Sequence, residues 1–453
     1  MTGTDSLIQT PRMFTSSTLK QLILPLIIEQ VLAVSIGMAD TIMIASVGEA
    51  SVSAVSLVDS LSNFFLQLFA AICTGGAVVV AQYIGQRDRT KAGDAAKQLI
   101  YAATSLALLI MILLLAFNRQ ILGLIYGSLD QAVMRNAEIY FMYILISFPF
   151  IAIYNSGAAL FRSMGDSRTS MNIALMMNFI NISGNAILIY GAGWGVAGAG
   201  TATLTSRMVA ALMMLLLVSR RGDKLHLHHL LRVRFQWPMV KRIMRIGIPS
   251  GIEGSMFHIG RILVQSLIAS MGTTALAANA IANAIAGFAN IPGTAIGLAT
   301  VTVVGQCMGA GEPQQAEYFT KRLLGMVYLS LFVITLGLSL MVEPMVGLFK
   351  LSQASSALAV QVLRICFIMN ALFWPLSFSL PQALRAAGDA RFTMVVSVCS
   401  MWVFRIGLSY LLGKYLGIGL MGVWIAMYID WVCRSICFTT RFFRGKWKLK
   451  RVL

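Results

Sequence analysis

Long apolar stretches separated by short polar ones dominate the chain. The first stretch, residues 19–46, is long enough to cross a bilayer as an α-helix, which takes about 20 residues. Eleven similar stretches follow it, and the pattern therefore predicts an all-α integral membrane protein with twelve transmembrane helices. The predicted spans are 19–46, 54–84, 94–117, 134–160, 169–190, 195–219, 240–270, 278–308, 319–343, 356–384, 392–414 and 418–440.

The second half of the chain repeats the first. The segment PLIIE, Pro25–Glu29, matches PSGIE, Pro249–Glu253. Two Arg-x-x-Gly-Asp turns begin at Arg162 and Arg385, and nearly the same offset along the chain separates them. A six-helix unit has both ends on one side of the membrane, so two copies keep the same orientation. They form two lobes related by a pseudo-twofold axis along the membrane normal, around a central cleft.

Lysine and arginine are concentrated in alternate connections between the spans. Such residues favour the cytoplasmic side, so we expect both termini in the cytoplasm and the protein in the inner (cytoplasmic) membrane. The organisation that follows is a cytoplasmic tail (1–18), an amino lobe (19–219), a cytoplasmic linker (220–239), a carboxyl lobe (240–440) and a basic cytoplasmic tail (441–453).

The composition agrees with a membrane protein and narrows its function. Of the residues, 58% are hydrophobic and 11% are charged, whereas a soluble domain carries about 25% charged residues. The net charge of +18 is explained by the connections, so we expect no nucleic-acid partner. We find no catalytic, phosphate-binding or metal-binding motif, and three linker histidines, His226, His228 and His229, have no acidic or cysteine partner nearby. We therefore expect no enzyme activity, no cofactor and no metal site.

The first span contains residues that a membrane helix normally avoids. Glu29 and Asp40 are separated by about 20° beyond three full helical turns, so both lie on one face. Carboxylates in the hydrocarbon layer are costly and usually functional. Asp40 is the first candidate for coupling to a cation or a proton. Pro25 removes a backbone hydrogen bond and predicts a hinge in the same helix.

Other polar residues in the amino half suggest partners for Asp40. Asn181 and Asn185 lie on one face of the fifth span, and Thr203 lies in the sixth. Together with a carboxylate, their oxygens suit a small cation or a carboxyl group that changes protonation. Hydrogen bonding between helices is the alternative.

The carboxyl half offers a second acidic candidate, Glu253, the repeat mate of Glu29. If both carboxylates face the cleft, they form an acidic mouth that attracts organic cations. Alternatively, each is held by a backbone group or an arginine. Asp430 and Arg434 are one helical turn apart in the last span, and we expect a structural ion pair between them. The 27 methionines suggest an adaptable, methionine-lined cavity.

The chain resembles the multidrug and toxic compound extrusion (MATE) family over nearly its whole length. The resemblance rests on MADTIMIASVG at the end of the first span, AQYIG, GQCMG, both Arg-x-x-Gly-Asp turns and DWVCRSICFTTRFFRGKW. It implies a twelve-helix, two-lobed antiporter that exports organic compounds in exchange for Na⁺ or H⁺. It places Asp40, Asn181, Asn185 and Thr203 in the amino-lobe coupling site.

The resemblance also implies a difference in the carboxyl lobe. Relatives with a cation site there have acids at the positions of Phe257 and of Trp374 or Pro375, and this chain has neither. We expect a monomer that binds small, cationic or amphipathic organic compounds. A lipid-linked precursor flippase of the same superfamily is one alternative, but the sequence shows neither a strongly basic cavity nor extra helices. A non-transporting membrane scaffold is the other.

Overall fold

The computed structural model is described for residues 12–127, 130–220, 233–450 and 452, and the linker histidines lie outside these residues. Among the described residues all regular elements are helices. In the first half these are α1 (Ser16–Ala45), α2 (Glu49–Gly85), α3 (Arg89–Ala116), α4 (Asn118–Tyr126), α5 (Gln131–Ser163), α6 (Ser167–Asn185) with a π-helical end η1 (Ala186–Gly191), and α7 (Gly195–Arg220).

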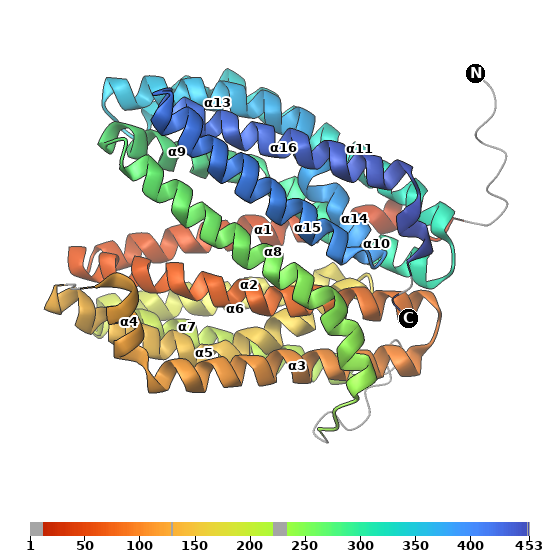
Figure 1. The fold of residues 1–453 in the computed structure, drawn as a ribbon. Coiled ribbons are helices and arrows are strands. Elements are labelled where there is room, and N and C mark those ends of the chain that lie inside the picture. Colours follow the sequence, from red (N-terminus) through yellow and green to blue (C-terminus); the bar gives the residue numbers. More distant parts are fainter. Residues whose placement is uncertain (1–11, 128–129, 221–232, 451, 453) are drawn as a thin grey trace.

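The second half contains the corresponding elements. These are α8 (Trp237–Ala269), α9 (Thr273–Ala289), α10 (Ile291–Gly309), α11 (Pro313–Leu340), α12 (Val342–Gly347), α13 (Gln353–Trp374), η2 (Pro375–Ser379), α14 (Leu380–Ala386), α15 (Ala390–Ser400), η3 (Met401–Gly407), η4 (Ser409–Tyr415), α16 (Leu420–Phe443) and η5 (Lys446–Leu449). Figure 1 shows the two halves as separate bundles that converge at one end and diverge at the other.

The repeat is visible in the element boundaries. Helix α2, Glu49–Gly85, and the pair α9–α10, which spans 273–309, begin and end at equivalent positions of the two copies. In the second copy the helix is interrupted at Asn290, because Pro292 cannot donate a backbone hydrogen bond in the first turn of α10. The predicted span 278–308 is therefore two helices.

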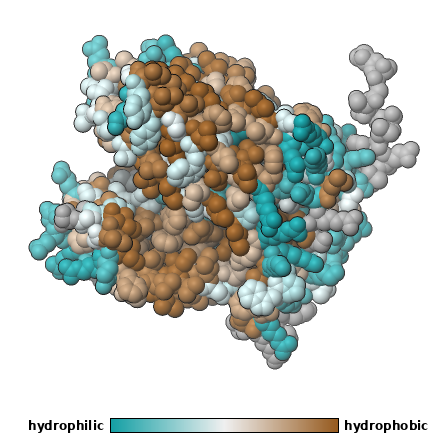
Figure 2. Space-filling model, viewed as in Figure 1, coloured by the Kyte–Doolittle hydropathy of each residue, from teal (hydrophilic) through white to brown (hydrophobic). Residues whose placement is uncertain are grey.

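Eleven of the described helical stretches are long and apolar enough to cross a membrane. The remaining predicted span, 240–270, corresponds to α8, which is 33 residues long. Its apolar character is diluted by Glu253, His258 and Arg261, which line a cavity. Figure 2 shows a hydrophobic belt between two polar ends, as expected for a protein that spans a bilayer.

One end of the molecule carries the basic helix termini, and we call it the basic end. It contains the start of α3, the end of α7, the start of α8 and the end of α16, with both described chain ends nearby (Figure 1). The terminal segments bind the carboxyl lobe there: the Met13 backbone N–H donates to Gln315 at 3.0 Å, and Trp447 is buried. The surface is hollowed between the lobes at the opposite end (Figure 2).

Candidate functional site

The amino lobe brings together all four residues predicted for the coupling site. Asn185 Nδ2 donates to Asp40 Oδ1 at 2.7 Å, linking α6 to α1. Asn181 Nδ2 donates to Thr203 Oγ1 of α7 at 3.2 Å, and its Oδ1 lies 3.4 Å from Asn185 Nδ2. Asn185 Oδ1 is buried and has no hydrogen-bond partner among the described residues. A carboxylate and a free amide oxygen are ligands that suit a small hard cation.

Three residues next to this cluster, Asp59, Tyr140 and Arg207, were not predicted from the sequence as part of the site. Tyr140 on α5 donates to Asp59 Oδ1 on α2 at 3.3 Å, and Arg207 on α7 donates to Ser147 at 2.7 Å. Asp59 and Arg207 both interact electrostatically with Asp40. Both are ionisable residues inside apolar spans, so the signal that identified Asp40 was present for them too. The positive charge of Arg207 balances one of the two negative charges of Asp40 and Asp59.

The two turn arginines hold the second acidic candidates. Arg162 Nη1 lies 3.2 Å from Glu29 Oε1, and Ser170 donates to the other carboxylate oxygen at 2.6 Å. Arg385 Nη2 lies 2.8 Å from Glu253 Oε1. The four charged side chains are only 11–18% exposed. Because each carboxylate is paired, the structure favours the structural interpretation of Glu29 and Glu253 over a mouth of free negative charge.

Each turn folds this way for a local reason. Gly165 and Gly388 have φ values of +80° and +96°, which favour glycine because it carries no Cβ. Asp166 caps α6 by accepting the Thr169 backbone N–H at 3.2 Å. The turn thereby aims its arginine at the first helix of its own lobe.

A cavity of about 520 Å³ lies between the lobes. The amino lobe contributes residues of α2 and α5, and the carboxyl lobe contributes α8, α10, α16 and the α13–α14 region. Its aromatic residues are Phe257, Trp374 and Phe378, and the last two are stacked with centroids 5.2 Å apart. The expected methionine lining is wrong: the lining of this cavity contains no methionine. It includes four arginines instead, namely Arg162, Arg261, Arg385 and Arg434. The absence of a basic cavity, inferred from the sequence, is therefore also wrong.

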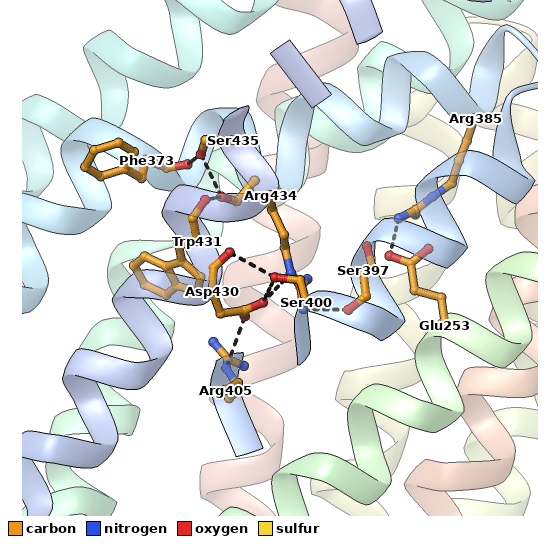
Figure 3. A network of polar contacts seen from close by, with 11 residues as sticks. Glu253, Phe373, Arg385, Ser397, Ser400, Arg405, Asp430, Trp431, Arg434 and Ser435 are labelled. Atoms are coloured by element: carbon orange, nitrogen blue, oxygen red, sulfur yellow. Dashed lines mark hydrogen bonds and ion pairs between the residues drawn. The ribbon is translucent and has the colours of Figure 1, made fainter. Parts of the chain in front are cut away.

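Asp430 is the centre of the carboxyl-lobe polar network, shown in Figure 3. It is fully buried and accepts from Arg434 Nε at 2.8 Å and from Ser400 at 2.5 Å. Arg405 Nε lies 3.3 Å from its other oxygen. The predicted Asp430–Arg434 pair is thus present and buried, and it anchors α16 to η3 and α15.

Phe257 lies at the position where the family resemblance implies an acid in relatives with a carboxyl-lobe cation site. The guanidinium carbons of Arg405 and Arg434 lie 5.1 and 5.7 Å from its ring centroid. An aromatic ring next to two guanidinium groups cannot supply an anionic ligand for Na⁺. Phe257 therefore supplies no ligand for such a site, and the carboxylate of Glu253, one helical turn away, is paired with Arg385.

At the basic end the lobes are joined by hydrogen bonds that follow the repeat. Gln82 Nε2 donates to the Ala386 carbonyl at 2.8 Å, and Gln306 Nε2 donates to the Ser163 carbonyl at 2.7 Å. The contact is so close that a Cβ on Gly309 would overlap the Gln82 carbonyl. The cavity is therefore closed toward this end.

Two helical lobes around a central cavity, with ionisable groups buried inside the spans, are typical of a membrane transporter. The MatE family model matches residues 25–187 and 249–411. These two segments start at the matching prolines of the internal repeat, Pro25 and Pro249, so the family match agrees with the repeat. The chain belongs to this family, the multidrug and toxic compound extrusion transporters.

Individual relatives agree with this assignment. The uncharacterized transporter YisQ of Bacillus subtilis is 29% identical, over 93% of each chain. The probable multidrug resistance protein NorM of Thermotoga maritima is 27% identical, over 96% of this chain and 93% of the relative.

Solved structures share the fold. An outward-facing MATE multidrug transporter has a TM-score of 0.88 at 22% identity, covering 95% of this chain and 96% of that chain. A transporter of Pyrococcus furiosus, described as having a binding pocket of reverse polarity, also has a TM-score of 0.88, at 21% identity and 96% coverage of both chains.

Proposed function

We propose that this transporter is an antiporter that exports organic compounds in exchange for Na⁺ or H⁺, by alternating access and as a monomer. The observation that carries the proposal is the Asp40–Asn185 contact of 2.7 Å within a polar cluster between transmembrane helices. A carboxylate in that position can bind a cation or take up a proton, and either event changes the charge of the amino lobe. No phosphate-binding loop accompanies it in the sequence, so an ion gradient is the energy source that fits.

The closed basic end also supports transport by alternating access. By the positive-inside rule the basic end is cytoplasmic, so this arrangement faces outward. Ion binding at Asp40 from the outside would precede closure of the outer end and opening of the inner one. Pro25 lies about four helical turns before Asp40 in α1, where it weakens the helix backbone between the site and the basic end.

The experiment is dye efflux from cells or membrane vesicles with Asp40→Asn. The substitution keeps the side-chain size and the contact with Asn185 but removes the negative charge. We expect efflux to be lost at normal membrane expression. Thr201→Val is a matched control, because Thr201 lies on α7 near Thr203 but its hydroxyl donates to its own helix, to Ala197 O at 2.8 Å. Wild-type efflux by Asp40→Asn would exclude Asp40 as the coupling group.

The lipid-linked precursor flippase was set aside partly because no basic cavity was visible, and that argument no longer holds. The helix count still favours the antiporter, since the described residues provide eleven stretches long and apolar enough to cross a membrane, with α8 at the remaining predicted span.

A further inference from the structure

One face of α8 is polar and lines the cavity between the lobes. Ser250, Glu253, Phe257, His258 and Arg261 recur at intervals of one, two and three helical turns, and all five border the cavity. Ser250 Oγ, Glu253 Oε2 and His258 Nε2 are buried without a hydrogen-bond partner among the described residues. Buried polar atoms of this kind normally find a partner. Three together on one cavity wall indicate a place where a ligand supplies the partner. Ser250 and His258 can donate to an anionic group, whereas Glu253 Oε2 only accepts and suits a donor elsewhere on the ligand.

The charges around this wall do not balance. Glu253 is neutralised by Arg385 at 2.8 Å. Asp430 has a single negative charge and contacts two guanidinium groups, Arg434 at 2.8 Å and Arg405 at 3.3 Å (Figure 3).

Arg261 adds a further positive charge to this wall. It borders the cavity and has no ion pair or hydrogen bond within the described parts of the chain, and it interacts electrostatically with Arg405. Arg405 and Arg434 share the Asp430 carboxylate, and Arg261 has no carboxylate partner within the described residues. These three arginines and one aspartate therefore leave an excess of two positive charges at and behind this wall.

From this excess we infer that the carboxyl-lobe wall of the cavity binds the anionic group of an organic substrate, a carboxylate, sulfonate or phosphate. The inference rests on the proposed export function and names its substrate class. Arginine is the residue best suited to such groups, because its planar guanidinium donates two parallel hydrogen bonds to them. Uncompensated positive charge inside the membrane is costly, and a bound anion would relieve that cost.

The rest of the cavity suits an aromatic or amphipathic body. Phe257, Trp374 and Phe378 border it beside the arginines, and aromatic rings pack well against flat organic molecules. A volume of about 520 Å³ is within the range of sites for one small molecule, about 300–1,000 Å³. The substrate class is thus a single organic anion with an aromatic part, and not the organic cation expected from Glu29 and Glu253, since both of these carboxylates are paired.

The inference is tested with two dyes that share a xanthene ring system but differ in charge: fluorescein, an anion, and rhodamine 123, a cation. Their binding to the purified full-length protein is measured by fluorescence anisotropy. We expect fluorescein to bind more tightly than rhodamine 123. Arg261→Gln should weaken fluorescein binding by about tenfold or more, the scale of one hydrogen bond to a charged group. Rhodamine 123 binding should not weaken.

Two further variants make the comparison specific. Arg119→Gln removes an arginine that is 82% exposed and pairs with Glu138, away from the cavity, and should leave both affinities unchanged. Arg261→Lys keeps the charge and should bind fluorescein more tightly than Arg261→Gln. If Arg261→Gln does not fold, the affinities of wild type and Arg261→Lys for the two dyes still test the inference. Tighter binding of rhodamine 123, no saturable binding of fluorescein, or equal losses for the two dyes in Arg261→Gln would each overturn the inference.

The anion has two possible sources, a soluble compound or a lipid headgroup, and competition separates them. Displacement of fluorescein by naphthalene-2-sulfonate indicates a soluble aromatic anion. Displacement by dihexanoyl phosphatidylglycerol but not by naphthalene-2-sulfonate or dihexanoyl phosphatidylcholine indicates an anionic headgroup, and both results support the anion site. Binding and export are separable. Fluorescein binding without gradient-driven export would support the anion site and contradict the proposed antiport. Gradient-driven export of rhodamine 123 alone would support the antiport and contradict the anion site.

Discussion

Gln82 and Gln306 join the two lobes with the same hydrogen bond made twice. Each side-chain amide crosses to the other lobe and donates to a backbone carbonyl, of Ala386 and Ser163 respectively. The two glutamines occupy equivalent positions in the repeat, in AQYIG and GQCMG, and their acceptors are the residues next to the two turn arginines. The closure at the basic end is therefore symmetric, and alternating access requires both bonds to break together.

The first prediction concerns this closure. Gly309→Ala places a methyl group against the Gln82 carbonyl, and overpacking of a close contact costs about 1–3 kcal/mol. We expect the closed basic end to become less populated and efflux to slow. The measurement is the reactivity of a cysteine introduced at Thr302, which lines the cavity. Its reaction with a reagent added from the cytoplasmic side should be faster in Gly309→Ala than in the wild-type background.

Gly325→Ala is the control, because a Cβ at Gly325 on α11 meets no atom within 4 Å. It should change neither efflux nor labelling. Equal labelling of the cysteine in wild type and in Gly309→Ala would show that this contact does not hold the basic end closed.

The second prediction concerns the pairing of Glu29 with Arg162. Removing one partner of a largely buried pair leaves an unpaired charge and costs several kcal/mol, about 3–5 kcal/mol in fully buried cases. We expect Arg162→Gln to lower the melting temperature, and Glu29→Gln with Arg162→Gln to restore most of it. Thermal unfolding of the four proteins of this double-mutant cycle measures the effect.

The Arg364–Glu343 pair is the matched control for that cycle. Its side chains are 58% and 68% exposed, and exposed pairs contribute about 0–1 kcal/mol. A coupling between Glu29 and Arg162 no larger than that of the control pair would contradict a structural role and return Glu29 to the candidates for substrate attraction.

The third prediction concerns Pro25, which lies inside the continuous helix α1. Alanine restores the missing backbone hydrogen bond and removes the clash with the preceding turn. We expect Pro25→Ala to slow turnover while leaving dye binding measurable, because the helix resists bending. Pro149→Ala in α5 removes another intrahelical proline and should affect turnover much less. Equal turnover of wild type and Pro25→Ala would argue against a hinge.

The fourth prediction concerns the orientation in the membrane, which so far rests on loop charge. Ser46 follows α1 and Arg89 begins α3, and both are exposed. Cysteines introduced at these two positions should react with a membrane-impermeant reagent from opposite sides of the membrane, Ser46→Cys from outside and Arg89→Cys from the cytoplasm. Labelling of both from one side would contradict the assigned topology.

Much of this fold could be predicted because each span carries its own signal. The hydrophobic pattern locates the helices, and the repeat supplies their symmetry. The Asp40, Asn181, Asn185 and Thr203 cluster was predicted from residues that are polar in apolar surroundings and fall at helical spacing, and the structure brings these four together. The break at Asn290 was not predicted, since the apolar run continues through Pro292.

The arginine-rich cavity could not be predicted from any single span. Arg261 lies on α8 and Arg405 on η3, with eight other helical elements between them in the chain, and only tertiary packing brings them close enough to interact electrostatically. Likewise, the sequence located Glu29, Glu253 and both turn arginines, but left open whether each acid is held by an arginine or faces the cleft. Charge compensation depends on which helix faces which, and periodicity within one helix does not contain that information.

The central claim is that an ion bound at Asp40 drives export. The most direct measurement uses proteoliposomes in which a Na⁺ gradient and an H⁺ gradient are imposed separately, with transport of fluorescein and rhodamine 123 and movement of the ion recorded together. We predict that one of the gradients drives dye movement in the wild type with opposite movement of the ion, and that Asp40→Asn binds dye but couples neither flux. Gradient-driven dye transport at the wild-type rate by Asp40→Asn, or no response of the wild type to either gradient, would contradict the claim.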